Sequence, residues 1–317
     1  MAERLSSLTM TPAKALLNTK SIVTMLLLSA VYLLLSRVIV GYKPDQVFLV
    51  VLANVLYFAS RVSRKLIIGF SIFIVYWVIF DYMKAFPNYE YNPVHIESLY
   101  QLEKSIFGFT AGGNIVTPNE YWNLYHHSFL DVLSGIFYLT WVPVPMAFAI
   151  YLFFKKKDQF IYFCLSFLLI NLIGFVIYYI YPAAPPWYVQ QHGFEFIANT
   201  PGNTGGLSRF DAFFHTPVFS SIYEKSSNVF AAMPSLHSSY PVLVLYYGLK
   251  NKLGKINILF AILMLGIWFS AVYTSHHYVL DVIAGFCCAL TGIVAFRWLN
   301  RKGPVRWLSG NMIRATA

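Results

Sequence analysis

Long uninterrupted apolar segments are the feature of this sequence that most restricts its fold. Eight segments approach or reach the roughly 20 residues that a helix needs to cross a bilayer. They are residues 22–40, 46–60, 66–82, 129–154, 160–181, 236–249, 256–274 and 278–298. Backbone polar groups find no water partners in hydrocarbon, so helices are the expected spanning form. The sequence therefore predicts an all-α polytopic membrane protein, a bundle of about eight transmembrane helices in which 46–60 and 236–249 are the shortest.

The composition agrees with this class. Hydrophobic residues make up 58% of the 317 residues and charged residues only 11%, whereas soluble domains carry about 25% charged residues. The formal net charge of +10 would also suit a nucleic-acid-binding surface. The positions of the basic residues decide between these two explanations.

Basic residues are distributed unevenly over the predicted loops. With eight spans, both termini and the even-numbered loops share one side, and 17 of the 23 Lys and Arg residues fall there. They are Arg4, Lys14, Lys20, Arg61, Arg64, Lys65, Lys155, Lys156, Lys157, Lys250, Lys252, Lys255, Arg297, Arg301, Lys302, Arg306 and Arg314. Only Glu3 and Asp158 of the 13 acids lie there. Basic loops stay in the cytoplasm, so this side is predicted to be cytoplasmic, and nucleic acid is not needed to explain the charge.

All eight histidines lie in, or at the edge of, segments predicted on the opposite side. They are His95, His126, His127, His192, His215, His237, His276 and His277. Two long loops, 83–128 and 182–235, contribute to this set, and loops of such length are commonly functional. A preference of histidine for polar loops explains a scatter of them, but it does not explain two particular arrangements.

The first arrangement places His237 at the predicted start of a helix. Pro234 and Ser235 are typical of a helix N-terminus, with Ser235 as a capping residue. His237 then lies in the first turn, where free N–H groups and the positive helix end favour an anion. Taken alone, the segment fits an ordinary capped helix better than it fits a site.

The second arrangement pairs His277 with Asp281. The two residues are four apart, so they share one helix face. A carboxylate bonded to one ring nitrogen fixes the tautomer and raises the basicity of the other, as in a catalytic triad. A carboxylate entering an apolar helix is costly and commonly functional. A purely structural His–Asp pair is the alternative.

The predicted topology brings the two histidines to one face of the membrane. His237 follows the loop 182–235, and His277 lies in the turn between the last two spans. Two helix N-termini, two imidazoles and the Asp281 carboxylate then converge on one phosphate. A phosphohistidine mechanism needs such a set: one histidine as nucleophile, the other as acid, and an orienting carboxylate.

Further polar and aromatic residues are assigned to substrate binding. Trp187 and Tyr188 end a proline-rich segment that also fits an interfacial aromatic belt. Gly205 and Gly206 permit close backbone approach to a ligand. Arg209 matches phosphate geometry, with a salt bridge to Asp211 as the alternative. Ser235, His276, His127 and Asp131 complete this group.

His127 and Asp131 repeat the spacing of four that His277 and Asp281 show. We rank this pair second, because no Ser-Leu-His helix start adjoins it, and expect it to line the headgroup pocket. Asp81, near the end of the third predicted span, is another costly acid and receives no assignment. The three cysteines lie inside predicted helices, so no disulfide framework and no metal-ligand set is expected.

Four segments in order resemble the type 2 phosphatidic acid phosphatase superfamily, and within it the aureobasidin-sensitive inositol phosphorylceramide synthase branch. They are Tyr-Pro-Ala-Ala-Pro-Pro-Trp-Tyr at 181–188, Gly-Gly-Leu-Ser-Arg-Phe-Asp at 205–211, Pro-Ser-Leu-His-Ser at 234–238 and His-His-Tyr-Val-Leu-Asp at 276–281. The resemblance covers roughly residues 80–300. It implies a six-helix catalytic core within the larger bundle.

The resemblance also implies a reaction. His277 would take the phosphoryl headgroup, Asp281 would orient it, and His237 would protonate the departing diacylglycerol and then deprotonate the acceptor. Phosphatidylinositol would be the donor and ceramide the acceptor, without metal or organic cofactor.

The chain departs from the wider superfamily in its cations. The superfamily pattern has a Lys and an Arg in its first motif and a Ser-Arg pair ahead of the nucleophilic histidine, but the segment 181–188 has no cation, and positions 270–271 are Ser270 and Ala271. Fewer cations suit a phosphodiester, which carries about one negative charge, better than a monoester, which carries nearly two. Headgroup transfer is therefore favoured over hydrolysis of a phosphatidate or isoprenoid phosphate, which remains the alternative.

A transporter is the competing class, because acids such as Asp81 and Asp131 inside spans are typical of transport pathways. No inverted repeat is visible, which disfavours it. We expect three regions: a transmembrane hairpin at 1–65, the catalytic core at 66–300 and a basic cytoplasmic tail at 301–317. A bacterial inner membrane with the site facing the periplasm is the expected location.

Overall fold

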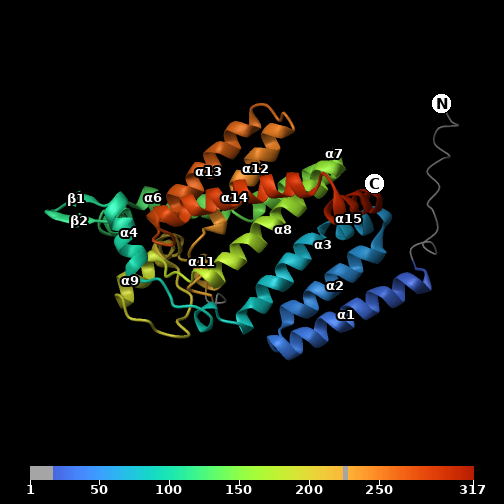
Figure 1. Cartoon of the computed structure of the whole chain (residues 1–317), viewed down its shortest axis with the longest axis horizontal. Helices are drawn as coiled ribbons and strands as arrows, with labels where there is room; N and C mark the ends of the chain where they lie inside the picture. The colour runs from blue at the N-terminus through green and yellow to red at the C-terminus, as the bar shows by residue number, and fades with distance from the viewer. Residues whose placement is uncertain (1–16, 224–227) are drawn as a thin grey trace. The chain divides into compact units, whose positions relative to one another are not determined.

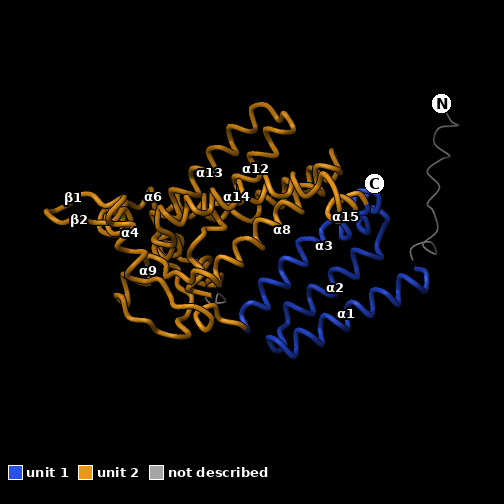
Figure 2. The backbone as a smooth tube through the Cα atoms, viewed as in Figure 1, with its two compact units in different colours: residues 1–85, 311–317 blue, residues 86–310 orange. Residues whose placement is uncertain are grey.

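The computed structural model describes residues 17–223 and 228–317, and these residues are mainly helical (Figure 1). The chain divides into two compact units, residues 1–85 with 311–317, and residues 86–310 (Figure 2). Glu3, Arg4 and Lys14, which the topology prediction used, lie outside the described residues. The predicted boundary between residues 65 and 66 separates a transmembrane hairpin from a catalytic core. The division into compact units after residue 85 reflects packing alone, so it does not test that prediction.

The first unit contains α1 (Thr19–Ile39), α2 (Pro44–Ala59) and α3 (Arg61–Tyr82), with α2 packed between the other two. Its helix starts follow local chemistry: Asn18 caps α1, Pro44 opens α2, and Ser60 caps α3. Asp81, left unassigned above, is buried at the end of α3. It forms ion pairs with Lys43 at 3.6 Å and Lys84 at 3.2 Å. These pairs account for the buried carboxylate without a role in transport.

The segment between α3 and α6, expected to be an irregular loop, contains secondary structure. It holds α4 (Glu97–Phe107), the strands β1 (Phe109–Ala111) and β2 (Asn114–Val116), and α5 (Pro118–Leu124). The strands form an antiparallel hairpin in which Phe109 pairs with Val116 and Ala111 pairs with Asn114. Gly112 and Gly113, both with positive φ, make the turn between them. Within the second unit, α4, α9 and the hairpin gather at one end (Figure 1).

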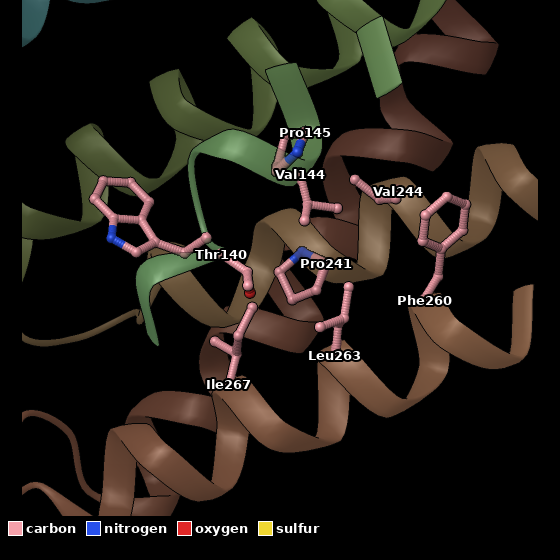
Figure 3. Close-up of a pocket in the computed structure, with 9 residues that line it drawn as sticks. Thr140, Val144, Pro145, Pro241, Val244, Phe260, Leu263 and Ile267 are labelled. Atoms are coloured by element: carbon pink, nitrogen blue, oxygen red, sulfur yellow. The ribbon is translucent and has the colours of Figure 1, made fainter. Parts of the chain in front are cut away.

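The predicted single helix at 129–154 is broken into α6 (Ser128–Leu139) and α7 (Pro143–Lys155). Proline donates no N–H and is favoured at the first position of a helix, where none is needed, so Pro143 starts a new helix. The break leaves a cavity of about 10 Å³, room for about one water. It is lined by residues of the break, α7, α12 and α13, which point toward one another in Figure 3. The break also brings Trp141 to the site described below.

The remaining helices build the core of the second unit. They are α8 (Lys157–Ile180), α9 (Pro186–His192), α10 (Ser208–Phe214), α11 (Val218–Tyr223), α12 (Leu236–Lys250), α13 (Ile256–Tyr273) and α14 (Val279–Leu299). The last helix, α15 (Gly303–Thr316), begins in the second unit, and its residues from Asn311 onward belong to the first. The helix α12 is packed by α8, α13 and α14. Its polar side chains are paired inside the bundle: Tyr240 donates to Asn171 Oδ1 at 2.6 Å, and Tyr247 lies 2.9 Å from the Ser166 hydroxyl. The predicted basic tail at 301–317 is largely helical, because α15 occupies most of it.

All eight predicted apolar segments are helical, and the all-α class is confirmed. In the described part of the chain, six helical segments are both long and apolar enough to cross a membrane: Thr19–Ile39, Arg61–Ala85, Ser128–Lys155 (α6 and α7 taken together), Lys157–Ile180, Ile256–Tyr273 and Val279–Leu299. The helices α2, with 16 residues, and α12, with 15, are shorter. The predicted count of eight spans is therefore not confirmed.

Candidate active site

His237 and His277 lie side by side although 40 residues separate them. His237 Nδ1 is 3.3 Å from His277 Nε2, and the ring centroids are 5.6 Å apart. His237 is half-buried in the first turn of α12, and His277 is buried in the turn between α13 and α14. The predicted convergence of the two imidazoles is present in the structure.

The start of α12 is fastened to the start of α14. Ser235 has an extended backbone and caps α12, accepting from the Ser238 N–H. The Ser235 N–H donates to the Asp281 carbonyl at 2.9 Å. One backbone bond therefore couples the helix that carries His237 to the helix that carries Asp281. The buried Ser235 hydroxyl serves as the cap, and its predicted substrate contact stays a prediction.

Asp281 lies behind the His277 ring at the predicted spacing of four, but His277 lies before α14 rather than on its face. Asp281 Oδ2 is 3.5 Å from His277 Nδ1 and accepts the Tyr278 N–H at 2.8 Å. Among the described residues, His277 Nδ1 has no hydrogen-bond partner. A separation of 3.5 Å is longer than a strong hydrogen bond, and such contacts commonly tighten when substrate binds. Burial lowers the pKa of His277 to about 4, so the ring is neutral and nucleophilic at pH 7.

Arg209 pairs with Asp131 rather than with Asp211. Its Nε donates to Asp131 Oδ1 at 2.6 Å, and the Tyr273 hydroxyl donates to the same oxygen at 2.8 Å. Asp211 instead accepts two backbone N–H groups at the start of α11, including that of Phe219 at 2.9 Å. The Asp211 alternative is therefore wrong, because the start of α11 uses that carboxylate. The proposed phosphate contact of Arg209 stays a prediction.

The predicted pairing of His127 with Asp131 is also wrong. His127 caps α6 with an extended backbone (φ −141°, ψ 136°), and its Nδ1 accepts the Phe129 N–H. The shared spacing of four does not give a pair here, because the His127 ring nitrogen is used at the start of its own helix. The neighbouring His126 pairs with Asp131 instead: its Nδ1 lies 3.3 Å from Asp131 Oδ2. His127 itself is exposed.

Gly205 and Gly206 approach the chain's own backbone closely. The Gly206 N–H donates to the Thr274 carbonyl at 2.8 Å. A Cβ on Gly205 would lie 2.6 Å from that same oxygen. The glycines thus let the 205–211 segment pack against the turn before His277. This packing gives both glycines a structural role that needs no ligand.

Trp187 and Tyr188 are buried, so the interfacial-belt interpretation is wrong for both. The Trp187 N–H donates to the Ser275 carbonyl at 2.9 Å. The Tyr188 hydroxyl donates to the Glu195 carbonyl and accepts the Ile197 N–H. The segment 181–188 therefore supports the turn that carries His277, and direct substrate contact by these two residues remains a prediction.

His276 is buried beside the pair of catalytic candidates. Its Nδ1 lies 3.0 Å from the Thr274 hydroxyl, and among the described residues its Nε2 has no partner. The ring packs against Tyr138 and Tyr223, with centroids 5.3 and 4.7 Å away. An unpaired nitrogen at this place supports the assignment of His276 to substrate binding.

Three residues near the site were missed. The Tyr138 hydroxyl lies 3.4 Å from His237 Nδ1, and Trp141 places its ring edge against the His237 ring, with centroids 4.3 Å apart. Glu103 of α4 accepts the N–H groups of Val279 and Leu280. No local pattern marks these residues, because each reaches the site from a segment far away in the sequence.

The Glu103 contacts correct one expectation. The start of α14 was predicted to hold a phosphate, but a carboxylate already occupies its first two N–H groups at 3.0 and 3.1 Å. Burial raises the pKa of Glu103 to about 7, with Asp281 adding to the shift and the two N–H groups opposing it. These two N–H groups of α14 are therefore not available to a phosphate.

Gly285→Ala is expected to lower activity at least about tenfold per folded molecule. A Cβ on Gly285 would lie 2.2 Å from the Ser235 carbonyl oxygen, a backbone atom two residues before His237. The start of α12 must then shift, and a displacement of about 1 Å at a catalytic group costs up to about 100-fold. The measurement is turnover of purified protein, normalised to the folded fraction.

Gly292→Ala is the matched control on the same helix. Its Cβ would meet the side chain of Ile170, away from the histidines. We expect it to lose stability, as overpacking does by about 1–3 kcal/mol, while the folded fraction keeps its turnover. Equal turnover losses in the two variants would contradict a specific coupling between α14 and His237.

The residues described provide little for a metal. Among residues 17–223 and 228–317, no group of three or more His, Cys, Asp or Glu side chains is arranged to hold a metal ion. The chemistry available at the site is that of two imidazoles and a carboxylate.

Comparisons with known proteins find relatives that match most of the chain. Phosphoinositol dihydroceramide synthase of Bacteroides thetaiotaomicron is 46% identical over 281 residues, 88% of this chain and 92% of that protein. The inositol phosphorylceramide synthase catalytic subunits of Schizosaccharomyces pombe and Saccharomyces cerevisiae are each 28% identical, over 250 and 217 residues, 77% and 67% of this chain. The matches cover about half of each fungal protein, 56% and 52%. No solved structure matches the chain.

The family model described as the PAP2 superfamily matches residues 114–295. This range contains both histidines, Asp281 and the helices that position them. The expected type 2 phosphatidic acid phosphatase resemblance is confirmed, and the chain belongs to the PAP2 superfamily.

Proposed function

We propose that this protein transfers phosphoinositol from phosphatidylinositol to a ceramide, releasing diacylglycerol. The observation that carries the proposal is the 3.3 Å contact between His237 and His277, with Asp281 behind His277. The similarity to phosphoinositol dihydroceramide synthase over most of both chains supports the same substrates.

The reaction proceeds in two displacements at phosphorus. In the first, His277 Nε2 attacks, the bond from phosphorus to the diacylglycerol oxygen breaks, and His237, protonated at both ring nitrogens, gives that oxygen one proton and becomes neutral. In the second, His237 takes the proton of the ceramide hydroxyl, whose oxygen attacks phosphorus and releases His277. Asp281 holds the Nδ1–H tautomer of His277, which leaves Nε2 free to attack.

The contact between the rings has a consequence for substrate binding. At 3.3 Å, the two nitrogens can share one proton, but no phosphorus with its oxygen fits between them. The His237 ring, which is only half-buried, must therefore turn aside when the lipid phosphate enters. Its proton then points to the place that the leaving oxygen takes.

The charges near the site favour a phosphodiester. The Arg209 guanidinium is balanced by the Asp131 carboxylate at 2.6 Å, so it adds little net positive charge. Hydrolysis of a phosphomonoester, which carries nearly two negative charges, would be served better by unpaired cations. Headgroup transfer therefore has more support than phosphatase activity.

An apolar groove near the catalytic turn suits a lipid substrate. It has a volume of about 370 Å³ and lies between α13 and α14, lined by Trp268, Val272, Val279, Val282, Ile283 and Phe286. Val279 follows His277 by two residues, and Val282 adjoins Asp281. Hydrocarbon of the substrate can be buried there while the phosphate meets the histidines.

We also propose a bacterial membrane as the location, with the catalytic histidines facing the periplasm. The clustering of Lys and Arg in the opposite loops supports this orientation, and the Bacteroides relative supports the bacterial source.

The test is product analysis with purified protein in lipid–detergent micelles. Phosphatidylinositol labelled in inositol is expected to yield labelled inositol phosphorylceramide with ceramide or dihydroceramide present, and diacylglycerol in equal amount. Phosphatidic acid is the comparison substrate. Release of inorganic phosphate from phosphatidic acid faster than transfer to either ceramide would refute the proposal in favour of a lipid phosphatase.

A further inference from the structure

Glu103 is a buried carboxylate that the proposed reaction does not use. It lies on α4 with no exposed surface. Its Oε1 accepts the Val279 N–H at 3.0 Å, and its Oε2 accepts the Leu280 N–H at 3.1 Å. A buried carboxylate is costly unless it is hydrogen-bonded, and these two bonds compensate it.

The two N–H groups open α14, and the first N–H groups of a helix have no acceptor within it. They also carry the positive end of the helix dipole, which an anion stabilises. Because each oxygen holds a different N–H, the carboxylate restrains both the position of α14 along its axis and its rotation. This restraint comes from a residue 176 positions earlier in the chain.

The first turn of α14 carries Asp281, and its rotation sets the distance from Asp281 to His277, now 3.5 Å. The turn between α13 and α14, which carries His277, is held by Asn119 of α5. Asn119 Nδ2 donates to the His277 carbonyl at 2.9 Å and to the Val272 carbonyl at 2.8 Å. Glu103, on α4, thus holds the turn that carries Asp281, and Asn119, on α5, holds the turn that carries His277. Both helices belong to the segment between α3 and α6.

We propose that Glu103 is a positioning residue for the phosphotransfer: its carboxylate holds the first turn of α14 so that Asp281 faces Nδ1 of His277. The inference rests on the proposed function. It differs from ordinary helix capping, which stabilises the protein without affecting the turnover of molecules that are folded.

The test compares Glu103→Gln, Glu103→Ala and the control Glu97→Gln with the wild type. Glutamine keeps the shape of the side chain but sets an amide NH₂ against one backbone N–H, so one of the two bonds is lost. Alanine loses both. Glu97 lies exposed in the first turn of the same helix, and its change leaves α14 untouched. Each protein is purified in detergent, and its folded fraction is measured by gel filtration.

The main readout is the single-turnover release of diacylglycerol from phosphatidylinositol, which reports attack by His277. Expected losses are about tenfold for Glu103→Gln and about 100-fold for Glu103→Ala, the size of effect that a displacement of about 1 Å has at a catalytic group. The KM for phosphatidylinositol should stay within about twofold, and Glu97→Gln should match the wild type.

Wild-type turnover in the folded fraction of Glu103→Gln would overturn the inference and leave Glu103 as a structural cap, whether or not Glu103→Ala folds. A rise in KM with unchanged kcat would overturn it as well, because positioning of Asp281 acts on the chemical step. A wild-type protein without transfer activity would instead refute the proposed function, on which the inference depends.

Discussion

His277→Gln is expected to abolish headgroup transfer, with a loss of at least about 1,000-fold in kcat. Removal of a covalent nucleophile eliminates the two-step route, and only binding and electrostatic effects remain. Glutamine approximates the size of the buried ring, so the turn between α13 and α14 should keep its fold. The measurement is transfer of labelled inositol phosphate to ceramide by the purified variant.

The same variant should also fail to become labelled. Wild-type protein incubated with phosphatidylinositol, labelled in its inositol headgroup, and no ceramide is expected to retain acid-labile label, as a phosphohistidine would. His215→Asn is the control: His215 is exposed and has a left-handed backbone that asparagine tolerates. Wild-type transfer by His277→Gln, or label that persists in it, would show that another residue is the nucleophile.

His237→Gln is expected to slow transfer by about 100- to 10,000-fold, the contribution typical of general acid–base catalysis. Its ring lies 3.3 Å from the proposed nucleophile and contacts the Tyr138 hydroxyl and the Trp141 ring. Because the proposed role is to protonate the leaving oxygen, the deficit should depend on the leaving group. Steady-state transfer and single-turnover release measure it.

A phosphodiester with a nitrophenolate leaving group separates the two histidines. Nitrophenolate departs without a proton, so His237→Gln should release it in single turnover at a rate within about tenfold of the wild type. His277→Gln should remain inactive with the same compound, since it lacks the attacking nitrogen. Equal deficits of His237→Gln with both kinds of leaving group would contradict the acid role and indicate a positional one.

The helices and the His277–Asp281 pair were predictable because their causes are local. Runs of apolar residues define the bilayer-length segments, and Ser235 caps α12 as its position predicts. Asp281 lies behind His277 at the predicted spacing of four, although His277 precedes α14 rather than lying within it. The same spacing was wrong for His127, because its ring nitrogen caps α6 instead of facing Asp131.

Other features depend on distant segments. Asp131 is the partner of Arg209 because α6 and α10 pack together, while the nearer Asp211 is used at the start of α11. The predicted phosphate site at the start of α14 is filled by Glu103 for the same reason. Spacing along a chain cannot identify such partners, because several acids could pair with the same group. The packing of the helices decides which of them does.

The sequence by itself determined the membrane-helix class, the helix starts and the identity of the two histidines and their carboxylate. Hydrophobic periodicity, capping and one-turn spacing act within a few residues, so each can be inferred from a short segment. Only the tertiary structure decided that the imidazoles meet at 3.3 Å and that Tyr138, Trp141 and Glu103 surround them. These contacts depend on how whole helices pack, and packing is set by the summed fit of many side chains rather than by any one motif.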